Sequence, residues 1–224
     1  MHRSQHRRDL PHPGSGRYPD PGPVCAGAPR LLNGAKAIFS LTGYQGILGY
    51  RTQNDIDIAA DDPRRPAFDA NRQAEIEAVK PVIERLKETG WTFGSHTWGH
   101  IRLDSRPLES VQRDTVRWAE EVGSLVGPTN ILFYPHGGRP DGDDWHSTGP
   151  VFQYLQSQGF RIFASVGINS FSYIKKDISA VICDRLHPDG TTLRNGKALE
   201  WYSQFYDARE IIDLDVRPDL GVTW

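Results

Sequence analysis

The sequence predicts an α/β protein built around a parallel sheet or an α/β barrel. Three observations support this class: short apolar runs rich in strand-forming residues, helical apolar periods between them, and regular alternation of the two along most of the chain. Strands that alternate with helices form parallel sheets, because a crossover helix returns the chain to the edge where the previous strand began. With 224 residues, the chain is long enough for one compact domain with a sizeable core.

Composition and charge exclude several classes of partner. Hydrophobic residues make up 38% of the chain, charged residues 24%, and the formal net charge is −2, so we expect no nucleic acid and no anionic membrane surface as a partner. No apolar run approaches the roughly 18–20 residues of a membrane span. The basic N-terminus is not followed by an apolar segment and therefore does not match a secretory signal. Cys25 and Cys183 fit no metal or redox spacing.

The chain divides into a tail and a domain. Residues 1–30 are rich in proline and glycine and have no hydrophobic period, so they cannot bury enough apolar surface to offset the entropy of ordering. We predict a disordered tail there, followed by one α/β domain over residues 31–224. Its first element is a strand at 35–42 (AKAIFSLT), which ends before Gly43.

The first half of the domain continues with a polar loop and then a helix at 71–89, where four apolar residues recur at helical spacing. Pro81 lies inside this period and is a candidate kink. Gly90 ends the helix, and a strand at 91–95 runs directly into His96. A second helical period covers residues 107–126.

The second half repeats the alternation of strands and helices. Residues 130–134 (NILFY) have strand character, and Ser147 is a candidate N-cap for a helix that ends at Gly159. The remaining predicted elements are strands at 160–166 and 178–183 and a helix at 197–206. This order of elements is the one expected of a parallel sheet or barrel.

A pair of histidines stands where such folds place their active sites, at the carboxyl end of a strand. His96 and His100 are four residues apart and would share one face if the chain turned into a helix after the strand. Two imidazoles so placed can bind a zinc-like cation. Chance surface pairs with this spacing are common, but the position at a strand end favours a metal site.

A third protein ligand is not evident from the sequence, although catalytic zinc sites normally have three. Asp104 lies four residues beyond His100, where a solvated or capping role is the simpler interpretation. An acidic loop after the first strand is most simply a solvated loop. Its acidic residues are Asp55, Asp57, Asp61 and Asp62.

Several other side chains at predicted strand ends are candidate site residues. His136 and His187 are single histidines at such positions, where a structural role is the more common one. Trp98 and Tyr134 can either stack on a sugar ring or pack in the core. We take Trp98, Tyr134 and His136 as candidate substrate-binding residues. No phosphate-binding glycine loop and no G-x-S-x-G serine-hydrolase pattern is present.

Two of these motifs resemble those of a known family. The stretch His96–His100 (HTWGH) resembles the His-Ser/Thr-x-x-His metal motif of the polysaccharide deacetylase family, carbohydrate esterase family four. The stretch Tyr134–Gly138 (YPHGG) resembles its third motif, with the usual arginine replaced. The resemblance covers about residues 35–219. The stretches that look like a deacetylase-like bacterial subgroup are 36–52, 163–170 and 185–194.

The resemblance implies a (β/α) barrel of the polysaccharide deacetylase type and a divalent metal, Zn in the first instance, held by an aspartate, His96 and His100. It implies hydrolysis of N- or O-acetyl groups on amino-sugar polymers or oligosaccharides as the reaction. His187 falls in the region of the family's last motif and is the candidate catalytic acid.

One family motif is absent from the sequence. The Thr-Phe-Asp-Asp type segment, which in the family supplies the metal-binding and proton-accepting aspartates on the first strand, is not found. Asp61-Asp62 is a consecutive acidic pair but follows the wrong strand. We therefore expect a barrel without its first strand and an impaired enzyme. The alternative is a non-catalytic remnant of the same fold that binds carbohydrate or metal.

Overall fold

The structure is a computed structural model that describes five stretches of the chain, 36–54, 57–142, 149–166, 173–175 and 179–183, with the single positions 185, 200 and 203. The predicted tail at 1–30 lies outside these residues. So do Ser147, His187 and most of the predicted helix at 197–206.

The described strands form one six-stranded sheet, which confirms the predicted α/β class with a parallel sheet. The strands are β1 (Ile38–Leu41), β2 (Thr92–Ser95), β3 (Ile131–Phe133), β4 (Ile162–Ala164), β5 (Tyr173–Lys175) and β6 (Ala180–Cys183). Their order is β1-β2-β3-β4-β6-β5, and every pairing is parallel except that of β5 with β6. This order has two ends, β1 and β5, so closure into a barrel stays a prediction. The sequence analysis missed β5, a three-residue strand at one end of the sheet.

Four α-helices accompany the described strands: α1 (Arg65–Glu88), α2 (Leu108–Trp118), α3 (Ser124–Val126) and α4 (Pro150–Ser157). Helix α1 begins six residues earlier than the apolar period predicted, because a proline in its first turn suits a helix start and Arg65 pairs with Asp69 one turn later. The helix runs through Pro81 without ending there. Within the described residues, no helix is long and apolar enough to cross a membrane.

The helix predicted at 107–126 is interrupted by a π-helical turn. Helix α2 ends at Trp118, a π-helical turn covers Ala119–Gly123, and α3 completes the segment. Such turns inside α-helices occur frequently at functional sites. Trp118 lies just before this turn, is buried, and donates its indole N–H to the carbonyl of Leu41 at 2.8 Å. This bond fastens the helix to the carboxyl end of β1.

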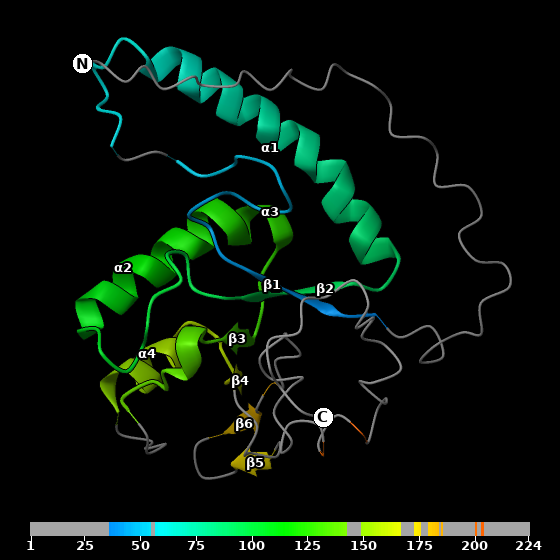
Figure 1. Cartoon of the computed structure of the whole chain (residues 1–224), viewed down its shortest axis with the longest axis vertical. Coiled ribbons are helices and arrows are strands. Elements are labelled where there is room, and N and C mark those ends of the chain that lie inside the picture. The colour runs from blue at the N-terminus through cyan, green and yellow to red at the C-terminus, as the bar shows by residue number, and fades with distance from the viewer. Residues whose placement is uncertain are drawn as a thin grey trace, which may run out of the picture. The chain divides into compact units, whose positions relative to one another are not determined.

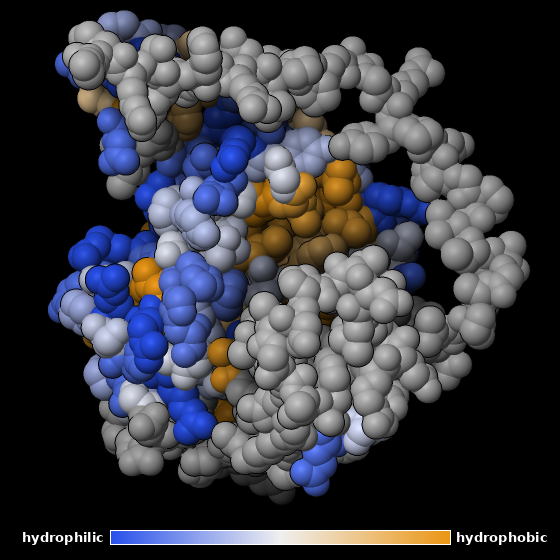
Figure 2. Space-filling view, in the orientation of Figure 1, coloured by the Kyte–Doolittle hydropathy of each residue, from blue (hydrophilic) through white to orange (hydrophobic). Residues whose placement is uncertain are grey.

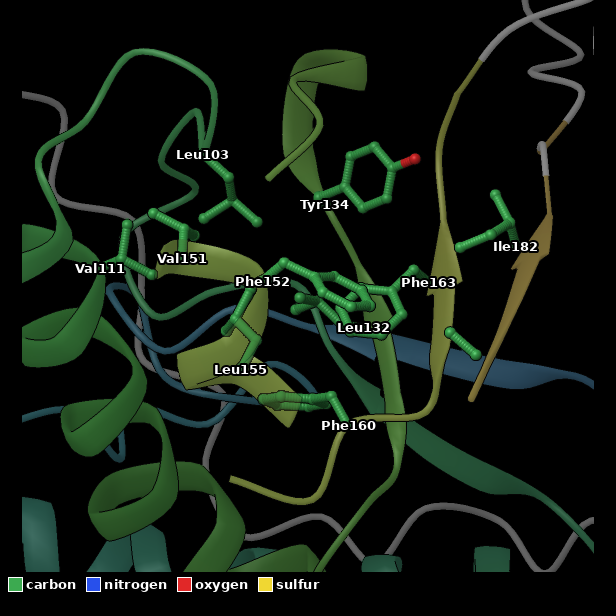
Figure 3. Close-up of a cluster of buried hydrophobic side chains, with 11 residues drawn as sticks. Leu103, Val111, Leu132, Tyr134, Val151, Phe152, Leu155, Phe160, Phe163 and Ile182 are labelled. Atoms are coloured by element: carbon green, nitrogen blue, oxygen red, sulfur yellow. The ribbon is translucent and has the colours of Figure 1, made fainter. Parts of the chain in front are cut away.

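Two hydrophobic clusters hold the helices to the sheet. One joins α2 and α4, which lie side by side (Figure 1), to strands β3, β4 and β6. In it, Phe152 and Leu155 from α4 point toward Leu132 and Phe163 of the sheet (Figure 3). The other joins α1 and the α2–α3 segment to β1 and β2. Figure 2 shows hydrophobic residues gathered where α1 lies over the β1–β2 side of the sheet. The clusters fix the strands whose carboxyl ends carry the histidines.

Candidate functional site

Three histidines gather where β2 and β3 end. The two strands are parallel neighbours, with Ser95 opposite Leu132, so the segments that follow them leave the sheet at the same edge. The segment after β2 carries His96 and His100, and the segment after β3 carries His136. The ring centroids of His96 and His100 are 4.8 Å apart, and those of His100 and His136 are 4.5 Å apart. His136, predicted to bind substrate, therefore adjoins the predicted metal pair.

The backbone brings His96 and His100 together in a different way from the one predicted. The chain does not turn into a helix after β2, so the argument from helical spacing is wrong. Thr97 and His100 instead adopt left-handed backbone angles, with φ of 59° and 53°. Thr97 is buried, and its hydroxyl oxygen accepts the N–H of Ile101 at 3.0 Å. A compact loop with two left-handed residues therefore brings the two histidine rings together, which a helical turn was expected to do.

The ring of His96 has one nitrogen fixed by a backbone carbonyl. Its Nδ1 lies 2.5 Å from the carbonyl oxygen of Phe133, a contact in which Nδ1–H donates and the carbonyl accepts. Partial burial lowers the pKa of His96 to about 4, reinforced by the positive charge of Arg185 and by the two neighbouring imidazoles. Burial, His136 and Arg185 also lower the pKa of His100. Near neutral pH both rings are uncharged, the form in which imidazole binds a metal.

These pKa shifts predict a pH dependence of stability for the metal-free protein. In the unfolded chain His96 takes up a proton as pH falls through about 6.5, whereas in the folded chain it stays neutral down to about 4. The unfolded state therefore binds more protons across this window, and the free energy of unfolding should fall as pH is lowered from 6.5 to 4. Urea unfolding with a chelator at several pH values measures this. The variant His96→Gln should show a shallower decline, and an equal slope in both proteins would contradict the prediction.

A half-buried aspartate that the sequence analysis did not single out holds the histidine loop. Asp114 of α2 accepts two backbone N–H groups between the histidines, from Trp98 through Oδ1 and from Gly99 through Oδ2, each at 2.7 Å. Burial raises the pKa of Asp114, and the two N–H donors and the charge of Arg117 act in the opposite direction. The carboxylate therefore works as a clamp on the loop. Asp114 lies in the period of a surface helix, so no signal in the sequence distinguished it from a solvated residue.

The side chain of Trp98 packs against residues from three neighbouring segments. Its indole N–H donates to Glu121 at 3.0 Å, and the guanidinium of Arg117 lies 3.4 Å from the ring centroid. A Cβ added to Gly43 would lie 2.1 Å from Trp98 Cδ1, so the ring also closes on the segment after β1. Glu121 belongs to the π-helical turn, which aims it at this tryptophan. These contacts favour the packing interpretation of Trp98 over the predicted stacking on a sugar.

Tyr134 also departs from the predicted substrate-binding role. The side chain is 0% exposed and stands among the core residues near Leu103 and Phe163 (Figure 3). In this structure its ring offers no face to a sugar. It follows a buried strand directly, and its ring continues the inward-facing pattern of Leu132. His136, two residues later, is exposed and remains accessible to a ligand.

Two of the alternative carboxylates that the structure describes, Asp62 and Asp104, are paired with arginines. Arg102 donates through Nε to Asp104 at 3.0 Å and lowers the pKa of that carboxyl group. Arg64 donates through Nε to Asp62, also at 3.0 Å, and lowers the pKa of Asp62 to about 2. In the described part of the chain, no group of three His, Cys, Asp or Glu side chains is already arranged to hold a metal ion. Asp55 and His187 lie outside the described residues.

This chain is similar to a family model and to a solved structure. Residues 65–159 match a family model whose description is polysaccharide deacetylase. That region contains the three clustered histidines and Asp114. A solved structure from Mycobacterium smegmatis, whose name assigns it to the polysaccharide deacetylases, is similar at 11% identity over 81% of this chain and 75% of that chain, with a TM-score of 0.37. Comparison with curated proteins gave no significant match.

Proposed function

We propose that this chain, whose residues 65–159 match the polysaccharide deacetylase family model, is a metal-dependent deacetylase that hydrolyses N- or O-acetyl groups on amino-sugar polymers or oligosaccharides. The family implies a polysaccharide substrate. The proposal of metal-dependent hydrolysis rests on one observation. His96, His100 and His136 form a cluster of imidazoles at the carboxyl edge of the parallel sheet.

The donor chemistry fits a divalent metal, with zinc as the first candidate. The contact between His96 Nδ1 and the carbonyl of Phe133 sets the tautomer in which Nε2 carries a lone pair, as is usual for histidines that bind zinc. The lowered pKa values of His96 and His100 keep both rings neutral, so no proton competes with the cation near pH 7. A metal held there would supply Lewis-acid polarisation of the acetyl carbonyl and activation of a water molecule.

We further propose that hydrolysis is slow, because the family motif that supplies the proton-accepting carboxylate is not found in the sequence. Two of the described alternatives, Asp62 and Asp104, are each paired with an arginine. General-base assistance typically contributes about 10²–10⁴-fold to such reactions. The same observation favours the alternative function, a remnant that binds metal or carbohydrate without turnover.

An acetate-release assay tests the proposed function. The full chain, an acetylated amino-sugar oligomer and added zinc should give slow turnover that a chelator removes. His96→Ala should abolish it, because the variant lacks the ring oriented by Phe133. Asp62→Asn is the matched control, since it alters an exposed ion pair of little energetic weight and should leave the rate unchanged. Turnover that survives His96→Ala would place the reaction elsewhere. Zinc binding without any acetate release would favour the non-catalytic alternative.

A further inference from the structure

We propose that His136 is the third protein ligand of the metal site, so that the cation is held by three imidazoles instead of the aspartate and two histidines that the family resemblance implies. This inference rests on the proposed function, because it assumes that His96 and His100 bind a divalent metal. Three histidine ligands with one open position form a well-known arrangement for catalytic zinc. No acidic residue is needed to complete such a site.

The first support is position. His100 contacts the rings of both other histidines, with centroid separations of 4.8 Å to His96 and 4.5 Å to His136. The two loops that carry them follow adjacent parallel strands and are fixed by the register of the sheet. Rings this close, on separate segments and at a strand edge, are within reach of one shared cation.

The second support is the backbone at His136. The residue has φ of 57° and ψ of 13°, a left-handed conformation that is uncommon for residues other than glycine. The turn around it is closed by the N–H of Gly138, which donates to the carbonyl of Pro135 at 3.1 Å. A Cβ added to Gly138 would lie 2.7 Å from Asp104 Oδ1, so the loop is packed tightly there. Unfavourable conformations held in this way cluster at functional sites.

The rings must turn before they bind metal. They meet edge to face, with interplanar angles of 72° and 67°, and within the described residues no group of three is already arranged as a metal site. His136 is exposed, so its ring can rotate without displacing core side chains. The proposal therefore requires a side-chain rotation at His136 and leaves the loop backbone in place.

Zinc binding by the chelator-treated full chain tests the assignment. Calorimetry gives the affinity, and X-ray absorption at the zinc edge counts the imidazoles on the metal. The substitution His136→Asn keeps a residue type that tolerates the left-handed backbone. Loss of groups that only orient a ligand costs 10–100-fold in affinity, so loss of the ligand itself should cost at least about 100-fold. The imidazole count should fall from three to two.

Two further variants sharpen the test. His136→Ala should repeat the loss of affinity, with a melting temperature of the metal-free protein close to that of the wild type. Asp104→Asn is the control, because it changes the carboxylate beside the same loop and should leave affinity and imidazole count unaltered.

Three results would overturn the inference. Tight binding by His136→Asn, with binding lost in His96→Ala, would leave the proposed function standing and assign the third ligand elsewhere. Loss of binding in Asp104→Asn alone would give the third position to that carboxylate. Failure of the wild-type chain to bind zinc would remove both the proposed function and the inference.

Discussion

Replacing Asp114 with alanine should weaken both the fold and the proposed metal site. The carboxylate accepts the N–H groups of Trp98 and Gly99 at 2.7 Å, and both lie between His96 and His100, the proposed metal ligands. The two N–H groups are partly buried. A buried donor left without a partner costs about 1–3 kcal/mol, so the loss of the acceptor of two partly buried donors costs toward the lower end of that range for each. Relief from burying the carboxylate, which raises the pKa of Asp114, offsets part of that cost. We expect a net loss of roughly 1–3 kcal/mol in the free energy of unfolding.

The same substitution should reduce zinc affinity by about 10–100-fold, since residues that orient metal ligands typically contribute that much. Urea unfolding measures the first effect and calorimetry with zinc the second. Asp114→Asn is the matched control: it has the same shape but a single acceptor oxygen, so both losses should be smaller. Zinc affinity equal to the wild type in folded Asp114→Ala would show that the loop holds its histidines without the clamp.

Replacing Phe163 with alanine should give the largest loss of stability from the core. The side chain is 0% exposed, lies on β4 in the middle of the sheet order, and its ring centroid is 5.0 Å from that of Phe152 (Figure 3). Truncation of a buried phenylalanine removes apolar contacts and leaves a cavity, which typically costs about 3–5 kcal/mol.

Denaturant unfolding of the Phe163→Ala chain, followed by circular dichroism, measures this cost. Val116→Ala is the surface control, because Val116 is 46% exposed and such changes usually stay within about 0.5 kcal/mol. Zinc affinity of the folded variant should change little, since its histidines follow β2 and β3. A loss below about 1 kcal/mol would mean that the neighbouring side chains close the space, and that this cluster is packed more loosely than the burial of Phe163 indicates.

The sequence by itself determined the elements whose signal is local. The helix that contains Val79 and Ile83 and the strand that ends just before His96 follow from apolar periods, which report the burial of one face of one element. The position of the histidine pair at a strand end follows from the same signals together with the rule for parallel folds. Boundaries were less exact: α1 begins at Arg65, ahead of its apolar period, because proline and an ion pair start it.

Only the tertiary structure decided which distant residues meet at the site. His136 reaches His100, and Asp114 reaches the loop after β2, through the register of β2 with β3 and the packing of α2. No periodicity within one element reports such a contact. The role of Tyr134 was decided in the same way. From the sequence, a tyrosine at a strand end can stack on a sugar ring. In the structure, core residues from other elements enclose the side chain completely, so Tyr134 belongs to the packing. Contacts between elements depend on how the elements pack around a common core, and the local pattern of residues does not predict them.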